Sequence, residues 1–283
     1  MSAILLDGRE LAKQLREQYR AKVTEASAAS GKPVTLETLR VGDAEDARLY
    51  EEAIGRLMEK VGIRHLKTLL PASAAAGDVR AAIHASASNA AVTGTLVLSP
   101  MPKHLPYQAL VAELPPHRDA EGTRYGSAGA AGVFPPTASA CFELVRAAGL
   151  PIAGKHAVVI GRSRIVGRPA AELLLEADAT VTLCHSKTQD LQSHVASADI
   201  IVAAVGRAAL IRGAWIKPGA VVVDAGENVV DGHPSGDVEF AAAQSRAGFI
   251  TPVPGGVGPV TSLMLVRNLI ALSASAPQAH PAA

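Results

Sequence analysis

Phosphate-binding chemistry is indicated by the stretch that follows the apolar residues 157–160. The predicted strand runs straight into Gly161, and Gly167-Arg168-Pro169 opens a predicted helix with proline at a first-turn position that needs no amide donor. A helix N-terminus with free backbone N–H groups at the carboxyl end of a strand stabilises phosphate. The glycine spacing differs from the common Gly-x-Gly-x-x-Gly fingerprint, so this motif alone leaves a plain strand-to-helix turn open.

A second polar cluster follows the next predicted strand, residues 179–183. After Cys184 the chain continues His185-Ser186-Lys187-Thr188, and the first acid is Asp190. Sites that bind NAD usually place an acid here to hold the ribose 2′-hydroxyl. An imidazole, a hydroxyl and an ammonium beside Arg162 suit a 2′-phosphate instead. The sequence therefore favours NADP over NAD, although Arg162 or Lys187 taken singly is also typical of an ordinary surface cation.

Several of these stretches resemble the bifunctional methylenetetrahydrofolate dehydrogenase/cyclohydrolase family. The resemblance lies in residues 161–169, 179–188, 215–224 and 254–259, the last reading Pro-Gly-Gly-Val-Gly-Pro. It implies NADP-dependent oxidation of 5,10-methylenetetrahydrofolate to 5,10-methenyltetrahydrofolate. The cofactor-binding residues that it implies are Gly161, Arg162, Ser163, Ile165, His185, Ser186, Val205, Gly206, Gly256 and Thr261.

The N-terminal half departs from the family where the family holds its substrate. The family's Tyr-x-x-x-Lys helix is here Tyr50 followed by Ile54, its serine is Ala47, and the glutamine of its proline-rich loop is Leu98. Glu121 stands where a family aspartate binds the amino-pyrimidine edge of the pterin. We predict Tyr50 and Glu121 as catalytic residues. The predicted substrate-binding residues are Tyr50, Leu98, Glu121, Pro254, Gly255 and Gly256.

The missing lysine separates the two reactions of the family. Cyclohydrolysis needs a proton shuttle, which Ile54 cannot supply, and a missing general acid–base group typically costs ~10²–10⁴-fold. Hydride transfer chiefly needs two carbons held in alignment. We therefore predict a dehydrogenase with weak or absent cyclohydrolase activity. Two alternatives are an NADP-dependent oxidoreductase on a non-folate substrate, because Ala47, Ile54 and Leu98 are apolar, and a noncatalytic NADP-binding homologue.

Strand-like and helix-like segments alternate along the chain, which is typical of parallel βαβ units. The predicted helices are residues 8–27, 45–61, 76–88, 137–148 and 260–273, with another opening at Gly167. The predicted strands are 34–41, 65–70, 94–98, 157–160, 179–183, 200–204, 220–224 and one near Ile250. This pattern predicts a two-domain α/β fold, with a substrate domain at 1–120 plus 262–283 and a Rossmann-type NADP-binding domain at 137–258.

Composition limits the partners and the compartment. The 283 residues are 48% hydrophobic, Lys plus Arg number 27 against 26 Asp plus Glu, and aromatics are 3%, so neither charge nor stacking favours nucleic acid. The N-terminus has no secretory pattern and no apolar run reaches ~20 residues, so we expect a cytoplasmic protein without a membrane partner. We expect reduced thiols at Cys141 and Cys184 and no metal site. The resemblance implies a homodimer.

Overall fold

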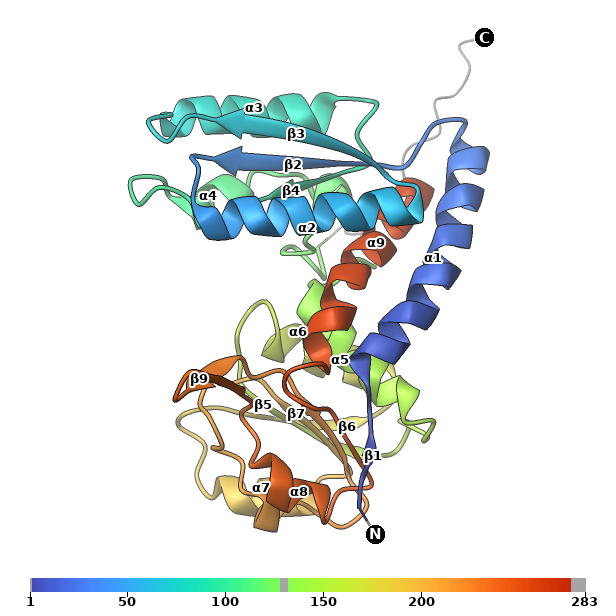
Figure 1. The fold of residues 1–283 in the computed structure, drawn as a ribbon, viewed down its shortest axis with the longest axis vertical. Coiled ribbons are helices and arrows are strands. Elements are labelled where there is room, and N and C mark those ends of the chain that lie inside the picture. The colour runs from blue at the N-terminus through green and yellow to red at the C-terminus, as the bar shows by residue number, and fades with distance from the viewer. Residues whose placement is uncertain (1, 128–131, 276–283) are drawn as a thin grey trace. The chain divides into compact units, whose positions relative to one another are not determined.

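The chain folds into two compact units, shown in the computed structural model in Figure 1, which describes residues 2–127 and 132–275. Unit 1 comprises Met1–Leu15 and Pro135–Met264, and unit 2 comprises Arg16–Phe134 and Leu265–Ala283. Each unit has its own parallel β-sheet with helices packed against it. The predicted two-domain α/β architecture is confirmed.

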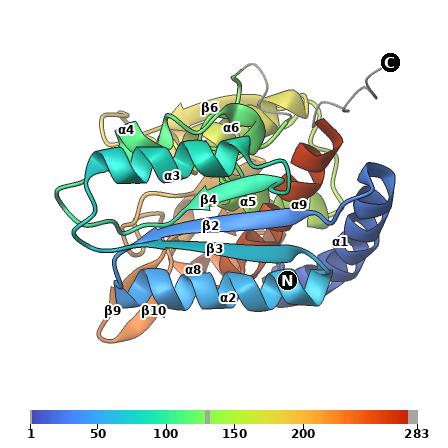
Figure 2. The same ribbon diagram turned by 90° about the horizontal axis from the view of Figure 1, so that it is seen from above.

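Unit 2 is built on a sheet whose strand order is β3-β2-β4, all parallel within the described residues. The strands are β2 (Thr35–Val41), β3 (Arg64–Leu70) and β4 (Gly94–Val97), and the helices between them are α2 (Glu45–Val61) and α3 (Ala76–Ser88). Every residue of β2 and β4 is buried. Figures 1 and 2 show α2 and α3 on opposite sides of this sheet, as right-handed crossovers in opposite directions require.

Helix α2 presents one apolar stripe to the sheet because its buried residues recur three or four positions apart. They are Ala47, Glu51, Ile54, Met58 and Val61. The charged member of this set is paired, since Glu51 accepts hydrogen bonds from Arg40 Nε at 3.1 Å and from Thr38 Oγ1 at 2.7 Å. The helix ends where Gly62 takes a left-handed φ of 80°. This stripe fixes which α2 side chains face the interior.

Unit 1 contains a parallel sheet of strand order β1-β11-β8-β7-β5-β6 in the part of the chain that is described. Its strands are β1 (Ile4–Leu5), β5 (His156–Ile160), β6 (Thr180–Cys184), β7 (Ile200–Ala203), β8 (Val221–Asp224) and β11 (Phe249–Ile250). Helices α5 (Pro136–Ala147), α6 (Gly167–Glu176), α7 (Leu191–Ser197) and α8 (Phe240–Gln244) accompany it. The continuous apolar runs of β7 and β8 are buried, as expected of a sheet covered on both faces.

The remaining elements are helices and a hairpin. Helices α1 (Gly8–Ser30) and α9 (Val257–Ser275) each contribute residues to both units, and α4 (Tyr107–Val111) packs against α3. The hairpin pairs β9 (Asn228–Val230) with β10 (His233–Ser235). Short single-turn helices lie at η1 (Pro116–Arg118) and η2 (Gly213–Trp215). The hairpin, α4, α7 and α8 were not among the predicted elements, because short elements carry little periodic signal.

The division into units differs from the predicted domains at the N-terminus. Residues 1–15 were assigned to the substrate domain, whereas the structure groups them with unit 1. The reason is strand pairing: β1 lies parallel to β11, with Ile4 opposite Phe249 and Leu5 opposite Ile250. Two residues are too short for a strand to be recognised from alternation alone. The C-terminal segment also enters unit 2 at Leu265 rather than at 262.

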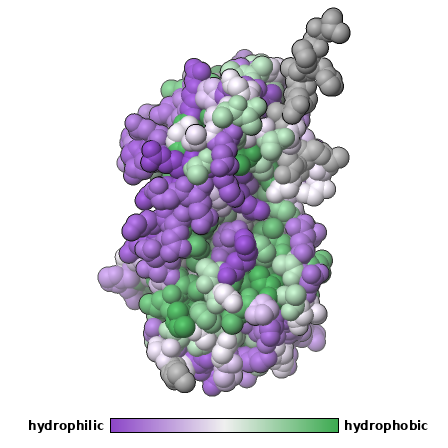
Figure 3. All heavy atoms as spheres, turned by 90° about the vertical axis from the view of Figure 1, so that its right-hand side faces the viewer, coloured by the Kyte–Doolittle hydropathy of each residue, from purple (hydrophilic) through white to green (hydrophobic). Residues whose placement is uncertain are grey.

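Apolar surface remains at the edge of unit 1. The edge-strand residues Ile4 and Leu5 are exposed, and Figure 3, which draws the side on which β1 lies in Figure 1, shows apolar atoms gathered in its lower part. Of the helices in the described residues, α9 alone is long and apolar enough to cross a membrane. Half of that window is buried inside the protein, as in the core helix of a soluble protein, so this is weak evidence for a membrane span.

Candidate cofactor and substrate sites

The turn between β5 and α6 can be made only by glycine at two positions. Gly161 has a φ of +117°, which side chains with a Cβ rarely adopt, and a Cβ there would collide with the carbonyl oxygen of Ala204. A Cβ at Gly167 would collide in turn with the carbonyl of Gly161. No side chain therefore covers the backbone at Gly161 and Gly167, where the turn leaves the sheet. Such a surface lets a phosphate approach the N-terminus of α6 closely.

Ser163 organises the turn from inside. Its Oγ accepts hydrogen bonds from the backbone N–H of Val166 at 3.1 Å and of Gly167 at 3.3 Å. With both lone pairs used, the hydroxyl proton is left to donate to a ligand. The neighbouring Arg162 and Ile165 are exposed, and Ile165 offers an apolar surface beside the arginine. The predicted cofactor residues of this segment thus lie together on one loop.

The tip of β6 lies next to the tip of β5, as predicted, because Ile160 is paired with Cys184. His185 Nδ1 accepts the backbone N–H of Lys187 at 3.1 Å, and His185 N–H donates to Thr188 Oγ1 at 2.8 Å. The first bond leaves the proton of a neutral ring on Nε2, which can then act as a donor. Ser186 and Lys187 are exposed beside it. These donors fit a phosphate on the adenosine ribose.

The turn after β7, which includes Val205 and Gly206, is held by one carboxylate. Fully buried Asp237 accepts backbone N–H groups from Val205 at 2.6 Å, Gly206 at 3.0 Å and Arg207 at 2.8 Å. The same carboxylate accepts Asn228 Nδ2 at 2.9 Å. The N–H groups of this turn are thereby satisfied internally. Val205 and Gly206 can meet a cofactor only through their carbonyls and their surface.

A second buried carboxylate supports the first. Asp224, at the end of β8, accepts backbone N–H groups from Gly226, Asp237 and Val238. Burial is the larger cause and the nearby charge of Asp237 the smaller one that together raise the pKa of Asp224 to about 6. Sequence reasoning missed both carboxylates as site residues. The available signal for Asp224 was its place at the end of the apolar run 220–223, whereas Asp237 lies in no such run.

The glycine-rich loop of unit 1 packs tightly on the start of α1. Gly8 N–H donates to Gly255 O at 2.9 Å, and a Cβ on Gly256 would lie 2.6 Å from Pro252 O. Gly255 has a φ of +110°, and Pro254 is exposed. Thr261 Oγ1 donates to Val257 O at 3.1 Å within α9. The predicted residues Pro254, Gly255, Gly256 and Thr261 therefore belong to unit 1, with the cofactor loops.

The predicted catalytic residues lie in unit 2 and interact electrostatically. Burial is the main cause that raises the pKa of Glu121 to about 7, with the charge of Asp119 adding to it. Burial, and then the charge of Glu121, raise the pKa of Tyr50 to about 12. The same two causes raise the pKa of Tyr107 to about 12. Tyr50 and Glu121 thus interact electrostatically, and Glu121 also interacts with Tyr107, which the sequence analysis missed.

Asp119 has a structural role beside this group. Its carboxylate accepts Thr123 Oγ1 at 2.7 Å and the backbone N–H groups of Gly122 and Arg124 at 3.1 Å each. These bonds close the turn that carries Glu121. Tyr107 is anchored by a 3.2 Å hydrogen bond from its hydroxyl to Val97 O. A tyrosine after Pro106, in a chain with four tyrosines, was the only sequence signal for it.

Three positions expected to shape the substrate pocket are instead interior. Leu98, predicted to bind substrate, is 2% exposed, and Ala47 and Ile54 are each 1% exposed. Ala47 and Ile54 belong to the buried stripe of α2, whereas Tyr50 is 40% exposed on the same helix. Leu98 is among the largest fully buried side chains of the described residues. The Leu98 side chain therefore lies in the interior, and its contact with a ligand stays a prediction.

The described residues contain no group of three or more His, Cys, Asp or Glu side chains placed to hold a metal ion. Cys141 and Cys184 are both buried free thiols. Burial, followed by the charge of Asp224, raises the pKa of the Cys141 thiol to about 12. That thiol is therefore protonated and unreactive at neutral pH. Neither cysteine takes part in the sites described above.

Together, a parallel sheet with a bare glycine turn and cationic strand tips, and a second α/β unit with an acidic and phenolic cluster, define a nicotinamide-dinucleotide-dependent class of enzyme. Two family models match the chain. Residues 6–121 match the catalytic domain of tetrahydrofolate dehydrogenase/cyclohydrolase, and residues 135–276 match the NAD(P)-binding domain of the same family. The chain belongs to the tetrahydrofolate dehydrogenase/cyclohydrolase family.

Individual relatives agree over nearly the full length. The bifunctional protein FolD of Chloroflexus aurantiacus is 44% identical, covering 95% of this chain and 97% of the relative. The bifunctional methylenetetrahydrofolate dehydrogenase/cyclohydrolase of Campylobacter jejuni is 33% identical with a TM-score of 0.89, covering 96% and 99% of the two chains. The Trypanosoma brucei enzyme, solved with NADP and an inhibitor, is 34% identical with a TM-score of 0.86, covering 97% and 98%. The predicted family and its cofactor domain are confirmed.

Proposed function

We propose that the protein oxidises 5,10-methylenetetrahydrofolate to 5,10-methenyltetrahydrofolate with NADP, and that its cyclohydrolase activity is weak or absent. The observation that carries the proposal is a contrast between the two units. The cofactor loops of unit 1 are complete, whereas position 54 of unit 2 is a hydrocarbon side chain enclosed in the interior. The chemistry that NADP supplies when bound is acceptance of a hydride.

The choice of NADP over NAD is supported by the strand tips. The exposed Arg162 and Lys187, with the hydroxyls of Ser163 and Ser186, offer donors at adjacent tips. His185 adds an Nε2–H donor because its Nδ1 already accepts a hydrogen bond. These groups can donate hydrogen bonds to a 2′-phosphate. The first acid of the segment, Asp190, instead caps α7 by accepting a hydrogen bond from Ser193 N–H. That carboxylate is therefore engaged away from a ribose 2′-hydroxyl.

Glu121 and Tyr50 are the groups proposed to hold and orient the folate. The amino group and ring N–H of a pterin are donors, so they bind an ionised carboxylate better than a neutral one. With the pKa of Glu121 raised to about 7, substrate binding also stabilises the ionised form. Tyr50 retains its proton at neutral pH and presents a partly exposed ring to a flat heterocycle.

The weak cyclohydrolase reaction follows from the chemistry of position 54. Hydrolysis of a methenyl carbon adds water and then moves a proton, and an isoleucine moves none. Hydride loss from the methylene carbon is driven by a nitrogen lone pair and needs alignment rather than a base at that place. The dehydrogenase step therefore survives where the hydrolytic step is lost.

The test is a pair of absorbance assays on the full chain. Incubation with 5,10-methylenetetrahydrofolate and NADP is expected to produce NADPH and the methenyl product, which accumulates. Incubation with 5,10-methenyltetrahydrofolate alone is expected to show decay no faster than the buffer blank. No NADPH formation above the blank sinks the dehydrogenase proposal, and rapid enzymatic decay of the methenyl compound sinks the second half.

The case for a non-folate substrate is weakened by the structure. It rested on an apolar pocket formed by Ala47, Ile54 and Leu98, but all three side chains are interior. A noncatalytic cofactor-binding role is likewise disfavoured by the acid and the two tyrosines, whose raised pKa values are typical of functional sites.

We further propose that the protein acts in the cytoplasm as a homodimer. The support is the family resemblance, together with the exposed apolar residues Ile4 and Leu5 on the edge strand of unit 1. Light scattering of the purified chain tests the assembly. A mass near twice 29.0 kDa is expected, and a monomer at micromolar concentration contradicts it.

A further inference from the structure

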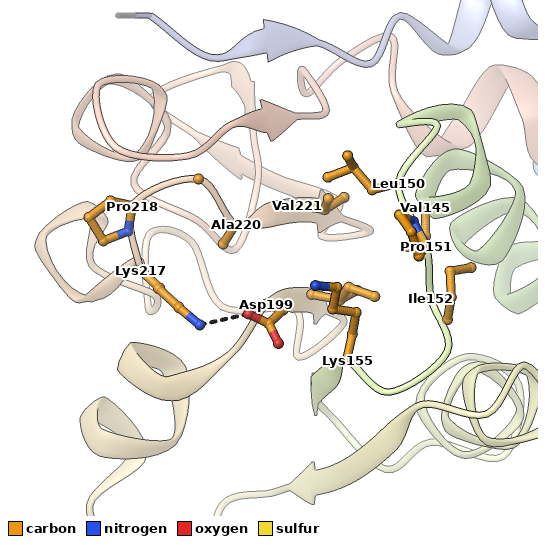
Figure 4. Close-up of a pocket in the computed structure, with 12 residues that line it drawn as sticks. Val145, Leu150, Pro151, Ile152, Lys155, Asp199, Lys217, Pro218, Ala220 and Val221 are labelled. Carbon is orange, nitrogen blue, oxygen red and sulfur yellow. Dashed lines mark hydrogen bonds and ion pairs between the residues drawn. The ribbon is translucent and has the colours of Figure 1, made fainter.

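Unit 1 has a pocket at the edge of its sheet opposite the cofactor loops. The pocket, of about 110 Å³, is lined by the end of α5 and by residues that precede or begin β5, β7 and β8, whereas the cofactor turns follow the strands. Its charged residues are Lys155, Asp199 and Lys217. Figure 4 shows these three on one side of the pocket, with Leu150 and Val221 across from them. The pocket therefore has one polar side and one apolar side.

The pocket has two lysine ammonium groups and one carboxylate, so one positive charge is not paired within it. Lys217 Nζ is 2.6 Å from Asp199 Oδ1, and Asp199 Oδ2 accepts the backbone N–H of His156 at 3.0 Å. The Asp199 carboxylate is thus occupied at both oxygens and offsets one ammonium. The hydrogen bond from Lys217 is the main cause that lowers the pKa of Asp199, and the charge of Lys155 contributes less. No hydrogen bond of the Lys155 ammonium is found among the described residues.

The apolar side is formed by aliphatic side chains from three elements. Val145 comes from α5, Leu150 and Ile152 from the loop before β5, and Val221 from β8. Leu150 is 46% exposed, so part of its surface gains from being covered by another apolar group. A cavity of ~150 Å³ accommodates a benzene-sized molecule, so the volume here suits a smaller, compact tail.

We propose that this pocket binds small monocarboxylates with a compact branched tail, whose carboxylate pairs with Lys155 and whose tail lies on Leu150, Ile152 and Val221. One negative charge matches the single uncompensated cation. A dianion would meet Asp199 at close range, and a neutral molecule would leave Lys155 unpaired. The ligand class is therefore an aliphatic acid of about four to six carbons.

The test uses 3-methylbutanoate as the probe and 3-methylbutanamide as its neutral isostere, on the full chain saturated with NADPH. Calorimetry measures the affinity. The fluorescence of Trp215, the only tryptophan and two residues from Lys217, reports where binding occurs. Saturable binding of the acid is expected, with the amide at least about tenfold weaker because a charge-assisted hydrogen bond is lost. No saturable binding, or equal affinity for acid and amide, overturns the proposal.

Variants locate the site. Lys155→Met keeps the aliphatic stem and is expected to weaken the acid at least about tenfold while leaving the amide unchanged. Leu150→Asp is expected to abolish binding of both, since it places a second acid on the apolar side. Lys103→Met, an exposed lysine of unit 2, is the matched control. NADPH affinity of each variant verifies folding, and Lys155→Gln substitutes if Lys155→Met does not fold. Acid binding unaffected by the change at Lys155 overturns the assignment.

Discussion

Glu121 is the residue whose charge is expected to set the pH dependence of turnover. Its pKa is raised to about 7 by burial and by Asp119, so the carboxylate that holds the pterin forms only as pH rises through neutrality. We expect kcat/KM for the folate to increase between pH 6 and 8 with a midpoint near 7. Initial rates measured across this pH range at saturating NADP give kcat/KM at each pH. Glu121→Gln is expected to lower kcat/KM about tenfold and flatten the profile; an unchanged midpoint in that variant contradicts the assignment.

Asp237 is expected to govern cofactor affinity without touching the cofactor. Replacement by asparagine removes the charge that three successive N–H groups share and turns an amide N–H₂ toward one of them. The turn 205–207 then loosens, and we expect the dissociation constant of NADPH to rise about tenfold. Fluorescence titration of NADPH measures it. Asp231→Asn, at an exposed position, is the control, and equal NADPH affinity in folded Asp237→Asn would show that the turn needs no such support.

The β5–α6 turn depends on glycine for two separable reasons, backbone conformation and space. Gly161→Ala meets both a φ of +117° and the carbonyl of Ala204. Gly154→Ala, also in unit 1, meets a φ of +73° with open space around it. We expect the control to lose about 1 kcal/mol of unfolding free energy and to keep NADPH binding. Gly161→Ala is expected to lose considerably more and to bind NADPH poorly. Denaturant titration measures the unfolding free energy of both variants, and calorimetry measures their NADPH affinity. Equal losses of unfolding free energy in Gly161→Ala and Gly154→Ala would contradict the steric argument.

Helix α2 shows why one substitution cannot restore a proton shuttle. Ile54 lies in the stripe that packs on the sheet, so Ile54→Lys buries an ammonium, and we expect the unfolding free energy to fall by several kcal/mol with no gain in methenyl hydrolysis. Leu49→Lys, 47% exposed on the same helix, is the control for stability. Adding Leu98→Gln to Ile54→Lys gives the ammonium an amide neighbour. Strong cyclohydrolase recovery from the single change would show that this environment already accommodates a lysine.

Much of the fold could be predicted from periodicity, and the reasons for the exceptions are physical. The bounds of α2 and α3 were predicted to the residue. Each helix has either a long amphipathic pattern or helix-breaking residues that mark its ends. β1 was not, because two residues show no alternation and its partner β11 lies at the other end of the chain. The β9–β10 hairpin was missed for the same reason of length.

The glycine turn and the strand tips of unit 1 follow from local motifs, whereas the interior of unit 2 depends on contacts between distant segments. The hydrogen bonds of Ser163 and His185 lie within a few residues of their own segments. Local motifs together with the family resemblance were therefore enough to propose them as cofactor-binding residues, and that role stays a prediction. Whether Leu98 faces a ligand or the core depends on elements distant in sequence, which a single chain does not reveal. Asp237 was missed as a support because its partners Val205, Gly206 and Arg207 lie about thirty positions earlier.

The whole protein is expected to be less stable at neutral pH than in mild acid on account of Glu121. Its native pKa of about 7 exceeds the ordinary 4.5, so the native state binds more protons between these values and its stability falls as pH rises through this window. Glu121→Gln lacks this titration. We expect the unfolding free energy of the variant relative to the parent to increase from pH 5 to 8, by at most about 3 kcal/mol. Urea titrations at several pH values measure it, and a constant difference contradicts the raised pKa.

Helix α9 has a consequence for synthesis on the ribosome. Its residues up to Met264 complete unit 1, and those from Leu265 complete unit 2, where Asn268 Nδ2 donates to the carbonyls of Ala120 at 3.0 Å and Phe134 at 2.9 Å. Neither unit can therefore close while α9 is still in the exit tunnel. Until α9 has emerged, the nascent chain must keep two unfinished cores protected.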